Sequence, residues 1–206
     1  MEVQKEPRVI SLMNHKGGVL KTTLSFNLAK NFMRNNRKVT TVDFDQQKNI
    51  ERMLPESTES GLNASELKSL GGDYVIVDTG PTFSQNHVQL LLKSDVVIVP
   101  CQLEGMDVQQ TVALFETAQA MNVLNKLKIV VVHSGKHTVM YKLLRPTVEE
   151  LASEFGVDII CEIQKNQSVS QANLQNKSVF EAQTAPQVRK EYKEFFKGVG
   201  KCLVQQ

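Results

Sequence analysis

The sequence predicts an α/β fold in which helices cover both faces of a single, mostly parallel, doubly wound sheet. Two observations lead to this prediction. Short runs rich in β-branched, apolar residues alternate along the chain with stretches whose apolar residues recur at helical spacing. The runs are apolar at odd and even positions alike, which is typical of strands buried on both faces of a parallel sheet. Strands that alternate with helices in this way indicate right-handed βαβ units.

The expected elements follow one another in a regular order. The strands are predicted at 9–13, 39–42, 74–77, 96–99 and 129–132, with 157–160 as a candidate sixth strand. The helices are predicted at 22–35, 85–92, 105–121 and 146–155. Pro146 opens the last of these, because proline is tolerated in the first turn of a helix. The carboxyl ends of such strands form the usual binding crevice, so the residues that follow each strand are the candidate site.

Length and composition favour one globular domain. The chain has 206 residues and a net charge of +2, so residues 1–206 are expected to form one domain, with 1–7 as a flexible N-terminal extension. The near-neutral charge excludes a histone-like nucleic-acid binder but leaves room for a local basic patch. The longest uncharged apolar stretch, 96–103, is far shorter than the roughly 20 residues that cross a bilayer. Without a signal peptide or paired cysteines, the chain is expected to be cytoplasmic.

A glycine-rich turn connects the first predicted strand to the first helix. Gly17 and Gly18 precede Lys21, Thr22 and Thr23. Backbone N–H groups at such a turn bind phosphate, a lysine reaches the β- and γ-phosphates, and a threonine hydroxyl binds Mg²⁺. The alternative is a tight turn beside an exposed lysine, which the strand–turn–helix context disfavours. The turn therefore predicts a nucleotide phosphate site.

One residue departs from the phosphate-loop pattern. Leu20 stands immediately before the lysine, where the pattern has glycine because the backbone approaches the phosphate closely. An isobutyl group at this position would crowd the β-phosphate or force the loop open. We therefore expect Leu20 to weaken nucleotide binding.

Three aspartates follow two further strands. Asp43 and Asp45 come at the end of the second predicted strand, and Asp78 comes at the end of the third. Beside a phosphate loop, such carboxylates hold the water shell of Mg²⁺ and orient an attacking water. The alternative is that Asp43 and Asp78 cap the turns or helices that follow them. Two aspartates at one sheet edge, together with the loop, favour nucleotide chemistry.

Taken in order, these motifs resemble the ParA/MinD family of deviant Walker P-loop ATPases, and most closely the short ParA-type DNA partition proteins. The resemblance implies the P-loop NTPase fold and spans about Arg8 to Lys197. The chain departs from the family at Leu20, and at Gln46, where proline is usual. The matching segments are 16–23 (the KGGxGKT[TS] loop), 42–47 (DxDPQ), 73–81 (the Walker B strand), 94–102 (ADxVxIPVQ) and 176–181 (GKPVFE).

The resemblance also implies a role for each residue of the candidate site. Lys16 would be the signature lysine that reaches the ATP of a partner subunit, and Asp45 would position the hydrolytic water. Mg²⁺ would be held by Thr22 and, through its water shell, by Asp43 and Asp78. The phosphate cradle would consist of Gly17, Gly18, Val19, Leu20, Lys21, Thr22 and Thr23. Gln164 and Lys165 stand where the family often has proline and arginine near the adenine, so they are the candidate base contacts.

Members of this family form ATP-bound homodimers, bind nucleoid DNA without sequence preference, and work with a centromere-binding, ParB-like adaptor. The resemblance thus implies ATP and Mg²⁺ as cofactors, slow hydrolysis that the adaptor stimulates, and association with the nucleoid. Contact with DNA needs a basic surface. The alternative for each basic cluster is a solvated helix face. The candidate DNA contacts are Lys142, Arg145, Arg189, Lys190 and Lys193, with Lys136 and Lys197 beside them.

Two rival interpretations remain. A C-terminal apolar stripe interleaved with lysines could lie on an anionic membrane, as in the MinD branch, although packing on the sheet is the favoured interpretation. The stripe consists of Tyr192, Phe195, Phe196, Val199 and Leu203. The second rival is a nucleotide-blind scaffold, which Leu20 and the missing proline motivate. The retained lysines and aspartates of the site argue against this second rival.

Overall fold

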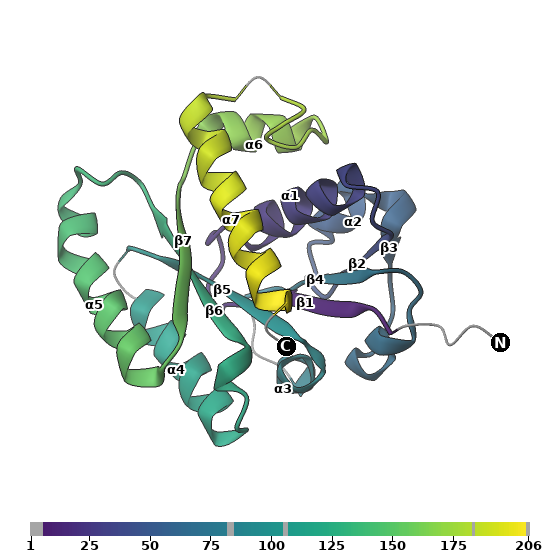
Figure 1. Ribbon diagram of the computed structural model, residues 1–206, viewed down its shortest axis with the longest axis horizontal. Coiled ribbons are helices and arrows are strands. Elements are labelled where there is room, and N and C mark those ends of the chain that lie inside the picture. The colour runs from purple at the N-terminus through teal and green to yellow at the C-terminus, as the bar shows by residue number, and fades with distance from the viewer. Residues whose placement is uncertain (1–5, 82–84, 105–106, 183, 205–206) are drawn as a thin grey trace.

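The structure confirms the predicted fold class. The computed structural model describes residues 6–81, 85–104, 107–182 and 184–204, and seven strands within these ranges form one parallel sheet (Figure 1). The order across the sheet is β3-β2-β4-β1-β5-β6-β7. The strands are β1 (Arg8–Leu12), β2 (Val39–Asp43), β3 (Thr58–Glu59), β4 (Tyr74–Asp78), β5 (Val96–Gln102), β6 (Leu127–His133) and β7 (Asp158–Gln164).

Helices cover both faces of the sheet. The helices are α1 (Lys21–Arg34), α2 (Asn49–Met53), α3 (Gln85–Lys93), α4 (Asp107–Ala120), α5 (Val139–Phe155), α6 (Gln167–Leu174) and α7 (Pro186–Val204), with short 3₁₀ turns at Pro55–Ser57, Ala64–Ser69 and Leu124–Lys126. Apolar side chains of α1, α2, α6 and α7 pack into one core cluster, and those of α3, α4 and α5 pack into a second on the opposite face. Both faces of the strands are therefore buried, as their sequence predicts.

The C-terminal apolar stripe packs on the sheet. In α7, Tyr192 is 1% exposed and Phe195 and Val199 are fully buried. Gly198 lets the helix approach β7, because a β-carbon there would lie 3.1 Å from Cβ of Ile160. The packing interpretation is confirmed, because the stripe packs against the core cluster on this face of the sheet. Among the described residues, no helix combines the length and apolarity needed to cross a membrane.

The structure corrects one predicted helix and adds elements that the sequence did not reveal. Helix α5 begins at Val139 and contains Pro146 in its interior. The Thr138 hydroxyl caps its first turn by accepting from the Tyr141 N–H, so the helix starts before the proline. The elements that were not predicted are β3, α2 and α6, each short and weakly apolar.

Two predictions fall partly outside the described residues. Of the predicted helix 105–121, residues 105–106 lie outside them, and α4 is described from Asp107. Of the expected flexible extension 1–7, residues 1–5 also lie outside them. Pro7 is buried and its carbonyl accepts a hydrogen bond from Nζ of Lys68 at 3.5 Å, so the end of this segment is held against the domain.

The strand order places three strand ends together. β1 lies in the middle of the sheet between β4 and β5, and β4 separates it from β2. Asp43 on β2 lies in register with Asp78 on β4, and Leu12 on β1 lies in register with Asp78 on its other side. The glycine-rich turn, Asp43 and Asp78 therefore share one edge of the sheet, which is where doubly wound folds bind ligands.

Candidate functional site

The glycine-rich turn between β1 and α1 has the backbone of a phosphate-binding loop. Gly18 adopts a left-handed conformation with φ of 76°, and there is open space within 4 Å of where a β-carbon would stand on Gly17 or Gly18. The turn leads directly into α1, which places the N-terminal N–H groups of that helix at the sheet edge. Helix N-termini preceded by such a turn attract anions.

Lys21 is held inside this loop. Its amine donates to the Asn14 carbonyl at 3.0 Å and to the Lys16 carbonyl at 2.7 Å. An ammonium has three N–H donors, so these two bonds leave one for a ligand. Burial lowers the pKa of Lys21, whereas the nearby carboxylates of Asp78 and Asp45 raise it.

Asn14 fixes the start of the loop, a role that the sequence did not predict. Its side-chain amide donates to the Pro100 carbonyl at the end of β5 at 2.8 Å, and its side-chain oxygen accepts from the Lys16 N–H at 3.0 Å. The side chain is fully buried. The loop that holds Lys21 is therefore tied to the neighbouring strand.

Leu20 takes the backbone conformation that glycine takes most readily. Its φ of 69° and ψ of 15° are left-handed, which costs a leucine about 1–2 kcal/mol. Its side chain is partly buried and packs against the core cluster under α1. This packing offsets part of the backbone strain, so leucine can occupy a position that the pattern reserves for glycine.

Asp78 presents an oxygen that no described residue satisfies. Ser25 donates to Oδ1 at 3.1 Å, but Oδ2 is buried without a hydrogen-bond partner among the described residues. Burial raises the pKa of Asp78 to about 7, even though the hydroxyl of Thr22 and the amine of Lys21 favour the charged form. A buried carboxylate oxygen beside a threonine hydroxyl and an ammonium fits a ligand that brings a divalent cation.

Asp43 and Asp45 hold the chain that follows β2. Asp43 Oδ1 accepts from the Asp45 N–H at 2.9 Å, and Oδ2 accepts from the N–H groups of Ile50 and Glu51 at 3.1 and 3.2 Å. The alternative role of a cap is thus observed for Asp43. Burial raises its pKa, and these backbone donors oppose the shift. Asp45 lies beside Gly80, since a β-carbon there would be 3.4 Å from its Oδ1.

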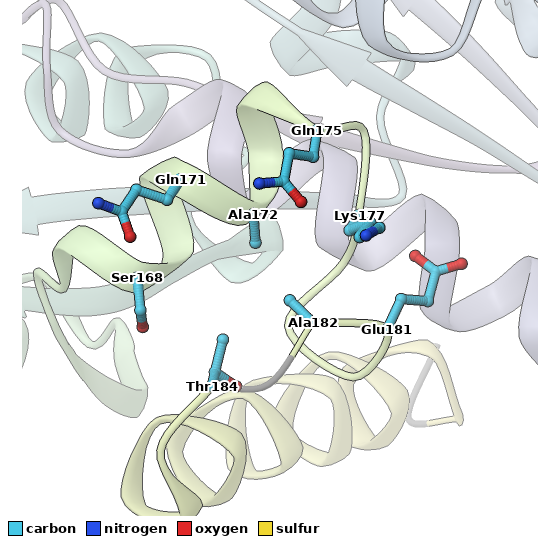
Figure 2. Close-up of a pocket in the computed structure, with 8 residues that line it drawn as sticks. All are labelled: Ser168, Gln171, Ala172, Gln175, Lys177, Glu181, Ala182 and Thr184. Atoms are coloured by element: carbon cyan, nitrogen blue, oxygen red, sulfur yellow. The ribbon is translucent and has the colours of Figure 1, made fainter.

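Two cavities flank α6. One of about 520 Å³ opens beside Thr22 and Thr23, with walls from α1, α2 and α6. The other, about 390 Å³, lies on the opposite side of α6 and is lined by polar side chains that include Gln171, Gln175 and Glu181 (Figure 2). The side chain of Gln164 donates to the Ser134 carbonyl at 3.2 Å, and its contact with the base stays a prediction.

The two groups of predicted DNA contacts differ in their surroundings. Arg145 binds Glu162 at 2.6 Å and Glu149 at 2.9 Å. The lysines of α7 are exposed, and none of them forms an ion pair with another described residue. These lysines are the predicted Lys190, Lys193 and Lys197, together with Lys201, which was not predicted as a DNA contact.

Comparisons with known proteins agree with this geometry. A model of the CobQ/CobB/MinD/ParA nucleotide binding domain matches residues 10–179. Maintenance of carboxysome distribution protein A from Halothiobacillus neapolitanus is 25% identical over 192 residues, which cover 84% of this chain and 86% of that protein. A variant of Cyanothece McdA in complex with ATP is similar in structure, with a TM-score of 0.78 at 17% identity and 97% of each chain covered.

A second solved structure has the same fold. A plasmid partition protein of Borrelia burgdorferi, bound to AMPPNP, has a TM-score of 0.73 at 18% identity and covers 95% of this chain and 99% of its own. The family model spans most of the sheet, including the phosphate loop and the three aspartates. The chain therefore belongs to the MinD/ParA family of P-loop nucleotide-binding ATPases.

Proposed function

We propose that this protein is a ParA-type ATPase that segregates DNA. It binds ATP with Mg²⁺, dimerises on binding, and in this state associates with nucleoid DNA without sequence preference. A ParB-like adaptor bound to a centromere stimulates its slow hydrolysis. The observation that carries the proposal is the convergence of the Lys21 amine, the Thr22 hydroxyl and the unsatisfied Oδ2 of Asp78 at one sheet edge.

The residues of the loop fit the phosphates of ATP. The remaining N–H of Lys21 and the backbone N–H groups of the loop would bind phosphate oxygens. Thr22 and Asp78 would hold Mg²⁺, with Asp43 reaching it only through water because its carboxylate already accepts three backbone N–H groups. Bound ATP supplies the phosphoanhydride bond, and the protein contributes position and charge.

Two further residues complete the proposed site. Lys16 belongs to the loop itself and would reach the phosphates held by a second copy, which couples nucleotide to dimerisation. Asp45 would orient the attacking water. Leu20 would lower nucleotide affinity relative to glycine, because the packing of its side chain against the core cluster holds the loop backbone and limits its close approach to the phosphates. If Leu20 abolished nucleotide binding altogether, the protein would be the nucleotide-blind scaffold of the rival interpretation.

The lysines of α7 are the proposed DNA surface. Lys190, Lys193, Lys197 and Lys201 are spaced three and four residues apart, so they form one stripe about 16 Å long on the exposed side of the helix. A stripe of this length lies along about five base pairs of a duplex strand. Arg189 lies at its edge, whereas Arg145 is neutralised by carboxylates.

Binding of a labelled DNA duplex, measured with ATP·Mg²⁺, with ADP·Mg²⁺ and without nucleotide, tests the proposal. We expect binding only with ATP. Replacing all four stripe lysines with glutamine should lower the slope of log affinity against log salt by about 3 to 4, at about 0.9 per phosphate contact. Lys93→Gln is the control, since Lys93 is exposed at the end of α3 and is not among the candidate DNA contacts. DNA binding that is equal in all nucleotide states would contradict the proposal.

A second candidate function is positioning of a protein assembly. The relative from Halothiobacillus neapolitanus is named for the distribution of carboxysomes, and it matches over most of this chain. Such a role would use the same ATP cycle and the same DNA surface with a different cargo. The two functions separate in cells: loss of the protein would make plasmids unstable in the first case, and would cluster the assembly in the second.

A further inference from the structure

The backbone of Lys16 is held at both of its polar groups. Its N–H donates to Oδ1 of the Asn14 side chain at 3.0 Å, and its carbonyl accepts from the Lys21 amine at 2.7 Å. Asn14 is fully buried and Lys21 is 6% exposed, so both contacts come from the interior of the domain. Together they fix the backbone from which the Lys16 side chain leaves the loop.

The two contacts differ in how they depend on nucleotide. Lys21 carries the amine that is expected to bind phosphate. A phosphate oxygen is a stronger partner for an ammonium than a neutral carbonyl is, so bound ATP would compete with the Lys16 carbonyl for this amine. The Asn14 side chain is not among the expected contacts of ATP. Its bond to the Lys16 N–H is therefore the contact that persists in every nucleotide state.

The Asn14 side chain is itself anchored to the sheet. The Met13 N–H donates to the Ile98 carbonyl at 2.9 Å, and the next carbonyl of β5 that faces β1 is that of Pro100, two residues further on. The Asn14 amide donates to this carbonyl at 2.8 Å, so the side chain continues the pairing of β1 with β5 where the backbone turns into the loop. A longer contact of 3.5 Å reaches the Thr111 hydroxyl on α4.

Anchoring alone would use only half of the Asn14 amide. A donor is enough to satisfy the Pro100 carbonyl, whereas the amide of an asparagine donates and accepts at once. Its accepting oxygen is directed at the residue that would cross to the nucleotide of a second subunit. Since a lysine side chain is long and flexible, fixing its backbone in advance leaves less to be ordered when two subunits meet.

We propose that Asn14 is a positioning residue for Lys16. It holds the Lys16 backbone in the orientation from which the side chain reaches the phosphates in a second subunit, and so it couples ATP binding to dimerisation without contacting ATP. This inference rests on the proposed function, because it concerns the step in which Lys16 crosses between subunits. Nucleotide binding within one subunit depends on Lys21, whose amine binds the backbone carbonyl of Asn14 at 3.0 Å, a group that side-chain substitutions retain.

Dimerisation and nucleotide affinity, measured on the same full-length variants, test this inference. Sedimentation with ATP·Mg²⁺ at a series of protein concentrations gives the dimer affinity, and calorimetric titration with ADP·Mg²⁺ gives the affinity of one subunit for nucleotide. We expect Asn14→Ala to weaken the dimer about tenfold and to change the ADP affinity by less than about twofold.

Asn27→Ala is the matched control. Asn27 is also fully buried, its amide donates to the Thr23 carbonyl at 2.8 Å, and its side-chain oxygen accepts from the Val179 N–H at 2.9 Å. The substitution thus removes the same kinds of hydrogen bond at a site that does not hold Lys16. We expect Asn27→Ala to lower the free energy of unfolding but to dimerise like the wild-type protein.

A conservative variant separates positioning from anchoring, and it keeps the test decisive if Asn14→Ala lowers stability. Asn14→Asp keeps an oxygen for the Lys16 N–H but loses the donor to Pro100. Both variants lose the anchor, so Asn14→Asp should dimerise more tightly than Asn14→Ala only if the bond to Lys16 matters.

Three results would overturn the inference and leave the proposed function standing. Asn14→Asp could dimerise as weakly as Asn14→Ala, Asn27→Ala could weaken the dimer to the same extent, or Asn14→Ala could lower the ADP affinity as much as the dimer affinity. A wild-type protein that stays monomeric with ATP·Mg²⁺ would contradict the proposed function, and this inference with it.

Discussion

Asp43 and Asp78 lie side by side at the ends of β2 and β4, yet their carboxylates differ in their hydrogen-bond partners. Asp43 uses both oxygens to accept backbone N–H groups from the chain that follows it. Asp78 leaves Oδ2 buried without a hydrogen-bond partner among the described residues. One aspartate thus holds the fold at this edge, and the other is available to a ligand.

Substitution of these two aspartates should separate stability from binding. Asp43→Ala should lower the free energy of unfolding by about 1–2 kcal/mol, because the first N–H groups of α2 lose their acceptor. Asp78→Asn should not lower the free energy of unfolding, because the amide oxygen can still accept from Ser25 and the substitution removes a buried charge. It should abolish the part of ATP affinity that depends on Mg²⁺. Denaturant unfolding measures the stability, and titration with ATP in the presence and absence of Mg²⁺ measures the binding. The assignment would be contradicted if Asp78→Asn lowered the stability and Asp43→Ala abolished the Mg²⁺-dependent affinity.

Leu20→Gly should tighten nucleotide binding by about fivefold, or about 1 kcal/mol. Glycine adopts the observed φ of 69° without strain, and it frees the loop backbone from the core packing of Leu20 so that the backbone can approach the phosphates closely. Leu20→Ala controls for the backbone, since it removes most of the side chain but keeps the strain. Calorimetric titration with ADP·Mg²⁺ and ATP·Mg²⁺ gives the affinities. If wild type and Leu20→Gly bind equally, the leucine is tolerated at no cost in affinity.

Asp45→Ala should abolish ATP turnover while nucleotide binding and dimerisation persist. The side chain lies beside Gly80 at the site edge, and the fold there depends on Asp43. Phosphate release gives the turnover, and sedimentation with ATP gives the dimerisation. Turnover that survives the substitution would move the water-positioning role to another residue.

Glu162→Gln should weaken the link between α5 and β7 in a pH-dependent way. Burial alone would raise the pKa of Glu162, but hydrogen bonds from Lys136, Arg145 and Tyr141 lower it to about 2. Because the folded-state pKa lies below the unfolded value of about 4.5, the carboxylate stabilises the fold above pH 4.5, and this contribution is lost as the pH falls towards 2.

We therefore expect Glu162→Gln to cost about 1–2 kcal/mol at pH 7, after allowance for solvent screening at this partly exposed group. The difference between variant and wild type should shrink as the pH falls from 5 to about 3. Denaturant unfolding at a series of pH values measures it. A difference that stays constant over this range would show that the ion cluster does not contribute through charge.

The sequence predicted the strands and the phosphate loop because both depend on local signals. Runs of β-branched residues such as those of β5 and β6 are typical of strands buried on both faces, and a glycine pair before a lysine, between a strand and a helix, is typical of a phosphate loop. The predicted start of α5 was wrong. The prediction placed Pro146 in the first turn of the helix, where proline is common, whereas the helix begins at Val139 after the Thr138 cap.

Other features of the site depend on contacts between distant residues. Asn14 donates to Pro100 on the neighbouring strand, and Ser25 donates to Asp78, but the spacing of these residues in the sequence predicts neither hydrogen bond. Among the candidate DNA contacts, the sequence also could not distinguish Arg145, which is ion-paired with Glu162, from the lysines of α7, which form no ion pair with a described residue. Pairings of this kind become visible only when the fold places the partners together.

Calorimetric titration of ATP·Mg²⁺ into the wild-type protein and into Lys21→Ala shows whether the glycine-rich loop binds nucleotide. Lys21 lies inside the loop and its amine has one donor left for a phosphate, so the site should depend on it. We expect the wild-type protein to bind ATP·Mg²⁺ with a stoichiometry near one, and Lys21→Ala, still folded, to bind at least about a hundredfold more weakly. Equal binding by the two proteins, or no binding by the wild type, would contradict this expectation.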